Sequence, residues 1–287
     1  MPLRIAKDTR PFPPLAHEKA ISYDEGTMLL ALKVGNTTMA AGVFQRETLR
    51  ADWHLTTRHD CTPDELGMSF LSFLEAAQLP AKQMEGIIIS SVVPPLNWRL
   101  SEACVKYFKR EATFLDHRWS LIPLDVREPE RVGTDRIANC LAGYRLYGGP
   151  LLIIDFGTAT TFNLVSSDGR FLGGAIAPTM ELAAETLVQR TAQLFKVELV
   201  PPPSIIGKDT EEHLQAGIVL GFLDLVQGLI ERFRREYQEP FRVVATGGRG
   251  EFFKAQIPAI ELYDPFLTLK GLRIAWEIRE RKQQKGL

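Results

Sequence analysis

The stretch LLALKVGNTTMAAGVF, residues 29–44, consists of two apolar runs joined by a turn of glycine and small polar residues. The stretch LLIIDFGTATTFNLV, residues 151–165, has the same shape. Apolar runs on both sides of such a turn predict two β-hairpins. Glycine lets backbone N–H groups approach a phosphate closely, and threonine hydroxyls can donate to its oxygens, so both hairpins are candidate phosphate sites. Aligned on their glycines, the hairpins place Lys33 where Asp155 stands.

The rest of the chain alternates between strand-like and helix-like segments, which predicts an α/β fold. The expected strands cover residues 28–34, 40–44, 86–93, 151–157 and 241–245, with a meander completed over 159–178 and one or two short strands within 112–126. The expected helices cover residues 63–79 with Thr62 as N-cap, 97–110, 134–148, 180–195, 212–237 and 267–285. Because a glycine hairpin opens each half, we expect two related domains, 28–142 and 143–287, after a mobile or loosely packed extension, 1–27.

Composition excludes several classes of function. The chain has 287 residues, 45% of them hydrophobic, and a formal net charge of -1, so no basic field favours nucleic acid or an anionic membrane. No apolar run approaches the roughly 20 residues of a membrane span. The three cysteines are far apart in sequence, which argues against structural disulfides and favours the cytoplasm.

The segment VGTDRIAN, residues 132–139, puts an acid and a guanidinium at the start of an expected helix. Asp135 could accept a proton from a hydroxyl that attacks phosphorus, and Arg136 could bind a substrate carboxylate through its planar fork. A purely structural interpretation is equally open at this point. In that interpretation Thr134 caps the helix and Asp135 complements its dipole.

Two further positions point to nucleotide chemistry. The carboxylate of Asp155, just before its glycine turn, could hold a hydrated cation against phosphates. The stretch TGG, residues 246–248, follows an expected strand, and a glycine turn there would let adenosine lie against the backbone. Each motif alone is also compatible with an ordinary turn.

Taken together and in order, the motifs resemble those of the type III pantothenate kinase family. They are GNTTMAAGVF, TPDELG, ISSVVPP, VGTDRIANCLAGY, IDFGTATTFNLV, LGGAIAPTMELAAETL, RTAQL, IGKDTEEHLQAGIVLG, ATGG and LTLKGLRIAWE. The resemblance runs from about Met28 to Trp276. It implies a duplicated actin-like (ribonuclease H-like) fold with a cleft between two related domains. It also implies phosphorylation of pantothenate by ATP, with Mg²⁺ and a monovalent cation (K⁺ or NH₄⁺), in a homodimer.

The resemblance also implies roles for individual residues. Asp135 matches the acid that takes the proton from the pantothenate hydroxyl, and Asp155 matches an acid near the metal and phosphates. The substrate-binding residues would be Gly133, Arg136 and, reaching the partner subunit's pantothenate, Thr191. The ATP-binding residues would be Lys33, Gly35, Asn36, Thr37, Thr158, Gly247 and Gly248.

At Lys33 the chain departs from the family pattern, which has an acid there. Lys33 could contact an ATP phosphate as a point charge, pair with Asp155 across the cleft and close an inactive site, or turn into solvent. Smaller departures are Val126 in place of a tyrosine, Phe195 in place of a proline, and His54 in place of an arginine. The function is therefore expected to be pantothenate phosphorylation, with two alternatives: a silent ligand-binding or regulatory homologue, or a kinase of another small alcohol.

Overall fold

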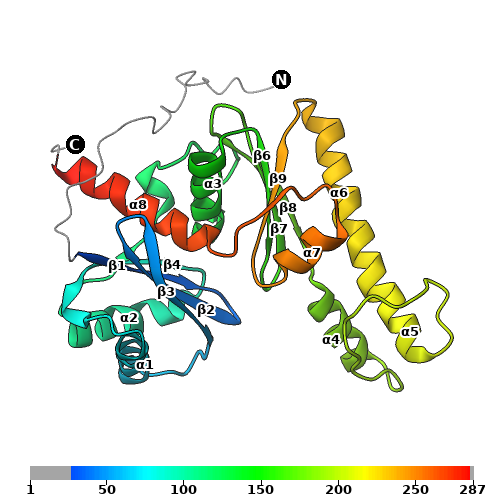
Figure 1. The fold of residues 1–287 in the computed structure, drawn as a ribbon, viewed down its shortest axis with the longest axis horizontal. Helices are drawn as coiled ribbons and strands as arrows, with labels where there is room; N and C mark the ends of the chain where they lie inside the picture. The colour runs from blue at the N-terminus through cyan, green and yellow to red at the C-terminus, as the bar shows by residue number, and fades with distance from the viewer. Residues whose placement is uncertain (1–26, 285–287) are drawn as a thin grey trace.

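A computed structural model describes residues 27–284, so the expectation for residues 1–27 lies outside the described part apart from Thr27. The first half is built on a five-stranded sheet in the order β3-β2-β1-β4-β5 (Figure 1). Its strands are β1 (Met28–Val34), β2 (Thr38–Gln45), β3 (Thr48–Thr56), β4 (Met84–Ser91) and β5 (Thr113–Phe114). The first three pair antiparallel as a meander, whereas β4 and β5 add in parallel.

The second sheet repeats this plan strand for strand. Its strands are β6 (Leu151–Phe156), β7 (Thr160–Val165), β8 (Phe171–Ala177), β9 (Arg242–Thr246) and β10 (Leu262–Tyr263). They lie in the order β10-β9-β6-β7-β8, with an antiparallel meander followed by two parallel additions. Two five-stranded sheets of identical topology confirm the expected α/β fold with a duplicated actin-like architecture.

The helices largely follow the apolar periodicity. They are α1 (Pro63–Ala76), α2 (Pro94–Ala103), α3 (Thr134–Tyr147), α4 (Met180–Arg190), α5 (Thr210–Gln215), α6 (Gly221–Tyr237), α7 (Gly250–Gln256) and α8 (Leu267–Gln284). Thr62 is the N-cap of α1 as expected, and Glu65 completes a capping box with it.

Some boundaries differ from the sequence prediction. Helix α2 begins at Pro94 instead of residue 97, because proline is well tolerated in the first turn of a helix. Helix α4 ends at Arg190 instead of residue 195, since Thr191 already has an extended backbone. Strand β3, helix α7 and the two-residue strand β10 were not predicted.

Three apolar clusters hold the molecule together. One lies on the outer face of the first sheet with α1 and α2, and another joins the second sheet to α5, α6 and α7. The third lies between the two sheets and includes α3, α8 and residues of both, such as Ala31 and Ile153. The C-terminal helix therefore returns to the first sheet, and the boundary expected after residue 142 falls within α3.

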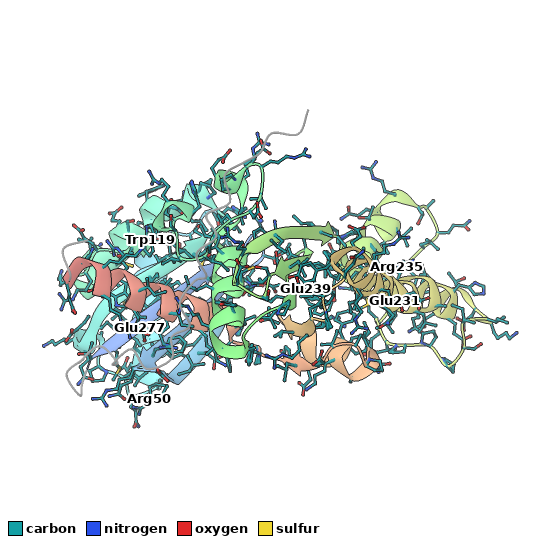
Figure 2. The ribbon with its side chains drawn as sticks, turned by 90° about the horizontal axis from the view of Figure 1, so that it is seen from above. Arg50, Trp119, Glu231, Arg235, Glu239 and Glu277 are labelled. Atoms are coloured by element: carbon teal, nitrogen blue, oxygen red, sulfur yellow. The ribbon has the colours of Figure 1, made fainter. Side chains whose placement is uncertain are left out.

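One helical segment in the described part of the chain is a membrane-span candidate. Residues 210–237, comprising α5, α6 and the π-helical segment Ala216–Leu220 that joins them, have the length and the apolar composition that a span requires. Its most apolar window is 44% buried, and Phe222, Val226 and Ile230 belong to the core of the second half. The exposed side chains of Glu231 and Arg235 also lie on α6 (Figure 2). A buried apolar face and an exposed charged face are typical of a core helix of a globular protein.

Helices α3 and α8 approach closely at a glycine. A Cβ atom added at Gly271 of α8 would lie 2.1 Å from the backbone oxygen of Ala138 in α3. A backbone atom cannot move aside as a flexible side chain can, so this crossing requires glycine.

We expect Gly271→Ala to lower the free energy of unfolding by about 2 kcal/mol or more, because the methyl group would push α8 off α3. Gly228 in α6 is the matched control, since a Cβ atom there meets nothing within 4 Å. Gly228→Ala should raise the free energy of unfolding by about 0.5–1 kcal/mol. Urea titration monitored by circular dichroism measures both. Equal effects of the two substitutions would contradict the close crossing.

Candidate active site

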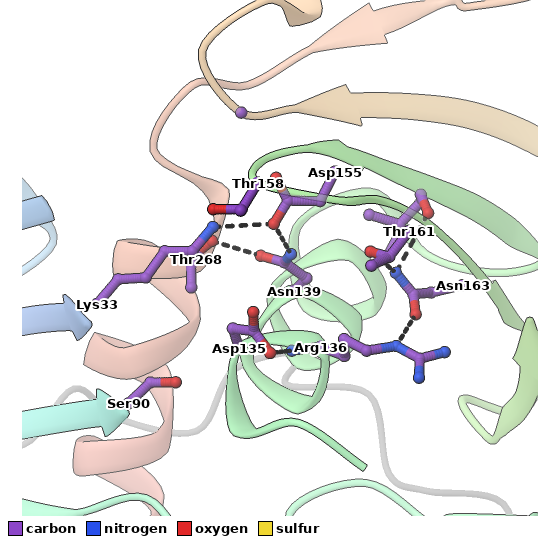
Figure 3. Close-up of polar contacts among 12 residues, drawn as sticks. Lys33, Ser90, Asp135, Arg136, Asn139, Asp155, Thr158, Thr161, Asn163 and Thr268 are labelled. Atoms are coloured by element: carbon purple, nitrogen blue, oxygen red, sulfur yellow. Dashed lines mark hydrogen bonds and ion pairs between the residues drawn. The ribbon is translucent and has the colours of Figure 1, made fainter. Parts of the chain in front are cut away.

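The site lies where the central strands of the two sheets end. Lys33 is the penultimate residue of β1 and pairs in register with Ser90 of β4. Asp155 is the penultimate residue of β6 and pairs with Thr246 of β9. The two positions are equivalent in the repeat, and their side chains point toward one another (Figure 3). Lys33 Nζ donates to Asp155 Oδ2 at 2.9 Å.

A chain of hydrogen bonds fixes the carboxylate of Asp155. Thr268 Oγ1 donates to Asn139 Oδ1 at 2.7 Å, and Asn139 Nδ2 donates to Asp155 Oδ2 at 3.0 Å. Because the Thr268 hydroxyl binds the amide oxygen of Asn139, the NH₂ group of Asn139 faces Asp155. Asp155 Oδ2 accepts from both Lys33 and Asn139, whereas Oδ1 is buried and has no partner among the described residues.

The ammonium group of Lys33 is held in its charged form. Burial by itself would lower the pKa of Lys33, but the carboxylates of Asp155 and Asp135 and the hydrogen bond to Asp155 outweigh it and raise the pKa. Its side chain is 21% exposed and that of Asp155 is 6% exposed. The first hairpin therefore presents a positive charge to the negative charge of the second.

The turns of the two hairpins also touch. Thr37 and Thr158 share a hydrogen bond between their hydroxyls at 2.6 Å. In the first turn, the N–H of Gly35 donates to the carbonyl oxygen of Thr38 at 3.0 Å, and Asn36 is exposed. The structure thus brings the expected phosphate residues of both halves to one place.

The glycine turn after β9 lies beside the same carboxylate. Gly247 has φ 88°, and a Cβ atom there would fall 2.7 Å from Asp155 Oδ1 and 2.5 Å from the backbone oxygen of Phe156. Glycine is required on both counts. The neighbouring Gly248 lines a small cavity of about 100 Å³ together with Gly157, Thr160 and Phe253.

Asp135 lies in the first turn of α3. The N-cap of this helix is Gly133, so the interpretation in which Thr134 caps it is wrong. The Thr134 hydroxyl instead shares a hydrogen bond with Ser90 of β4 at 2.8 Å. Asp135 Oδ1 accepts from the backbone N–H of Arg136 at 2.8 Å, and a Cβ atom at Gly133 would fall 2.6 Å from that oxygen.

The surroundings of Asp135 favour its role as a proton acceptor. Burial raises its pKa, as does the negative charge of Asp155, whereas the positive charge of Lys33 opposes the rise. A carboxylate with a raised pKa is a stronger base than an ordinary aspartate.

The guanidinium of Arg136 is held in place through its Nε atom. Its Nε donates to Asn163 Oδ1 at 2.7 Å, and its guanidinium lies 5.2 Å from the ring centroid of Phe171. Asn163 Nδ2 in turn donates to Thr161 Oγ1 at 3.1 Å. The terminal nitrogens of Arg136 lie outside this hydrogen bond and can bind an anion.

Not every expected residue lies in this group. Thr191 is exposed at the end of α4, where its hydroxyl donates to the carbonyl oxygen of Leu187 at 2.8 Å, and α4 is remote from α3 (Figure 1). Sequence reasoning also missed Asn139, Asn163 and Thr268. Only Asn139 had a usable signal, because it follows Asp135 by four residues and such residues share a helix face.

The side chains available as metal ligands favour a metal that needs few protein ligands. Within residues 27–284, no group of three or more His, Cys, Asp or Glu side chains is arranged to bind a metal. Cys61, Cys104 and Cys140 are buried free thiols. The buried, unpartnered Asp155 Oδ1 fits Mg²⁺, which is commonly bound through one or two carboxylates, with water and substrate phosphates completing its shell.

Comparison with known sequences identifies one family. Residues 29–232 match the sequence model of the family described as type III pantothenate kinase. A type III pantothenate kinase from Roseiflexus sp. (strain RS-1) is 41% identical over 252 residues, covering 88% of this chain and 99% of that protein. Another from Roseiflexus castenholzii (strain DSM 13941 / HLO8) is 39% identical over 255 residues, covering 88% and 100%.

Solved structures share the fold at much lower identity. One from Campylobacter jejuni, named for the Baf family of transcriptional activators, superposes with a TM-score of 0.55 at 20% identity, covering 88% of this chain and 99% of its own. Component A of (R)-2-hydroxyglutaryl-CoA dehydratase from Acidaminococcus fermentans gives a TM-score of 0.51 at 13% identity, covering 88% and 97%. These likenesses concern the fold alone.

The electrostatic interaction between Lys33 and Asp135 is testable. We expect Lys33→Met to raise the pKa of Asp135 further, because the positive charge that opposes the rise is removed. NMR titration of the aspartate carboxyl carbons measures this shift. Lys254→Met, at an exposed position on α7, is the control and should leave the pKa of Asp135 unchanged. An Asp135 pKa that is the same with and without Lys33 would contradict the arrangement.

Proposed function

Because this chain belongs to the type III pantothenate kinase family, we propose that it transfers the γ-phosphate of ATP to the hydroxyl of pantothenate. The product is 4'-phosphopantothenate, and the reaction is the first step of coenzyme A biosynthesis. One observation supports the proposal at the level of individual residues. The charge of Asp135 on α3 interacts with those of Lys33 and Asp155, which lie on two hairpins whose side chains can bind phosphate.

The proposed chemistry uses Asp135 as the base. The hydroxyl oxygen of pantothenate forms a bond to the γ-phosphorus, the bond from that phosphorus to the β–γ bridging oxygen breaks, and ADP leaves. The hydroxyl proton passes to Asp135, whose Oδ1 is held by the Arg136 N–H. Since the transition state is loose, the main task of Asp135 is to orient the hydroxyl.

Arg136 and Gly133 are the proposed substrate-binding residues at the start of α3. The carboxylate of pantothenate would bind the terminal nitrogens of Arg136, whose Nε is already anchored on Asn163. The absence of a side chain at Gly133 leaves the space that Asp135 Oδ1 occupies. Both features support binding of a small acid with its hydroxyl near Asp135.

The proposed nucleotide site combines residues of both halves. Lys33, Gly35, Asn36, Thr37 and Thr158 would contact the phosphates, and Gly247 and Gly248 would lie against the adenosine. Asp155 would hold Mg²⁺ through Oδ1, and the ion would neutralise charge on the transferred phosphate. The family resemblance also leads us to propose a monovalent cation, K⁺ or NH₄⁺, near the phosphates.

A cytoplasmic homodimer is the proposed assembly. Exposed apolar side chains gather on α4 and the segment that follows it: Leu182, Leu187, Phe195, Ile205 and Ile206. Thr191 lies in the same region, and the family resemblance leads us to propose that it reaches the partner subunit's substrate.

A silent homologue is the second candidate function, and the Lys33–Asp155 ion pair is the observation that favours it. If this pair stays closed, the positive charge of Lys33 opposes a metal ion at Asp155, and the protein would act as a ligand-binding or regulatory partner. Val126 is the sequence feature that points to a kinase of another alcohol. Its side chain lies close to Gly173 of β8. Gly173 follows Phe171 by two residues, and the Phe171 ring packs against the guanidinium of Arg136.

We expect ATP-dependent turnover of pantothenate, measured by ADP release and by mass of the phosphorylated product. Asp135→Asn should reduce kcat by about 10²-fold or more, because the base is lost while the shape is kept. Asp168→Asn, in the turn between β7 and β8, is the control and should retain turnover. Absence of product in the unmodified protein, together with turnover gained by Lys33→Asp, would support the silent homologue instead.

We expect the protein to elute as a dimer and Leu187→Asp to shift it toward the monomer, because the substitution places a charge in a proposed apolar interface. Light scattering after size exclusion measures the mass. Met68→Asp is the control, since Met68 is an exposed apolar residue on α1, away from that surface. A monomeric unmodified protein would refute the assembly.

A further inference from the structure

Lys33 and Asp155 occupy the same position in the two repeats but carry opposite charges. Each is the penultimate residue of the central strand of its sheet, and each faces the other across the junction of the halves (Figure 3). An acid at both positions would place two like charges together and require a cation between them. Here the ammonium group of Lys33 is that cation, and it is part of the chain.

The carboxylate of Asp155 does not depend on Lys33 for its orientation. Asn139 donates to the same oxygen, Oδ2, and Thr268 holds Asn139 in place. If Lys33 moved away, Asp155 would keep its direction and Oδ1 would still be available. The ion pair can therefore be exchanged without dismantling the site.

The charges of the site balance without a metal. Lys33 and Arg136 are positive and Asp135 and Asp155 are negative, so the four formal charges cancel. With an acid at position 33 the same group would carry three negative charges and one positive. A nucleotide polyphosphate entering that site would need metal to offset the repulsion, whereas here the lysine is already present.

The side chain of Lys33 is also well placed to change partners. The hairpins meet through the Lys33–Asp155 pair and the Thr37–Thr158 hydroxyl contact. Lys33, Thr37 and Thr158 are all residues expected to bind phosphate. A phosphate entering between the turns offers Lys33 a more highly charged acceptor than one carboxylate. Lysine has a flexible stem and three donors, so it can move by rotation of its own side chain.

We propose that Lys33 is a tethered cation that moves from Asp155 to the nucleotide phosphates, so that this protein binds nucleotide without a divalent metal and admits the metal to Asp155 only after Lys33 has left. The proposal deepens the proposed kinase function and concerns the same site. It makes Lys33 a positioning residue for the phosphates. It also makes Lys33 a competitor of the metal, because its positive charge on Oδ2 repels a cation from the neighbouring Oδ1 of Asp155.

The first experiment measures binding of ADP and of a non-hydrolysable ATP analogue by calorimetry, in excess EDTA and in saturating Mg²⁺. We expect removal of Mg²⁺ to weaken binding less than about fivefold in the unmodified protein, but about tenfold or more in Lys33→Met and Lys33→Asp. Lys33→Arg keeps the charge and should preserve metal-free binding. Lys254→Met, on the exposed face of α7, should behave as the unmodified protein.

The second experiment follows the metal directly. Binding of Mn²⁺ without nucleotide, detected by electron paramagnetic resonance, should be about tenfold or more tighter in Lys33→Met than in the unmodified protein, because Asp155 is then freed of its ammonium partner. A thermal melt of each variant checks folding. Lys33→Asp provides the same comparison if Lys33→Met fails to fold, whereas Lys33→Arg keeps the charge and should bind Mn²⁺ as the unmodified protein does.

The inference is overturned if the unmodified protein needs Mg²⁺ for nucleotide binding as strongly as Lys33→Met does, if it binds no nucleotide at all, or if Mn²⁺ affinity is unchanged in Lys33→Met. These outcomes are separate from those of the proposed function. Metal-free nucleotide binding with no turnover of pantothenate would leave the inference standing and refute the function, whereas strictly Mg²⁺-dependent binding with full turnover would do the reverse.

Discussion

The close crossing of α3 and α8 is the constraint on which the rest of the structure depends. Gly271 lies directly against the backbone of Ala138, and the two helices fill the apolar layer between the sheets. The same crossing places Thr268, three residues before Gly271, beside Asn139, the neighbour of Ala138. The packing of α8 on α3 therefore also orients the carboxylate of Asp155, through Thr268 and Asn139.

Helix α3 links the scaffold to the chemistry. Its buried face belongs to the central core, while its first two turns carry Asp135, Arg136 and Asn139. The candidate base, the candidate anion-binding group and the residue that orients Asp155 therefore lie on one rigid element. Side chains presented by a packed helix keep their relative positions better than side chains on a loop, which suits a reaction governed by positioning.

The repeat explains why the charge of Lys33 matters so much. Identical topology brings the ends of β1 and β6 face to face, so whatever stands at one position interacts strongly with the other. Opposite charges give a stable contact between the halves, and the buried ammonium group remains protonated because two carboxylates surround it. A single residue change in a duplicated fold thereby alters the charge of the whole junction.

The sequence by itself determined the repeat, most helices and the identity of the candidate phosphate and base residues, because apolar periodicity and glycine turns are local properties of the chain. It also offered three destinations for Lys33. Only the tertiary structure decided among these, and only it revealed Asn139 and Thr268, which are 129 residues apart. It likewise returned α8 to the first sheet and made Gly133 the cap of α3. Partners so distant are chosen by how the sheets and helices pack, and no local pattern encodes that choice.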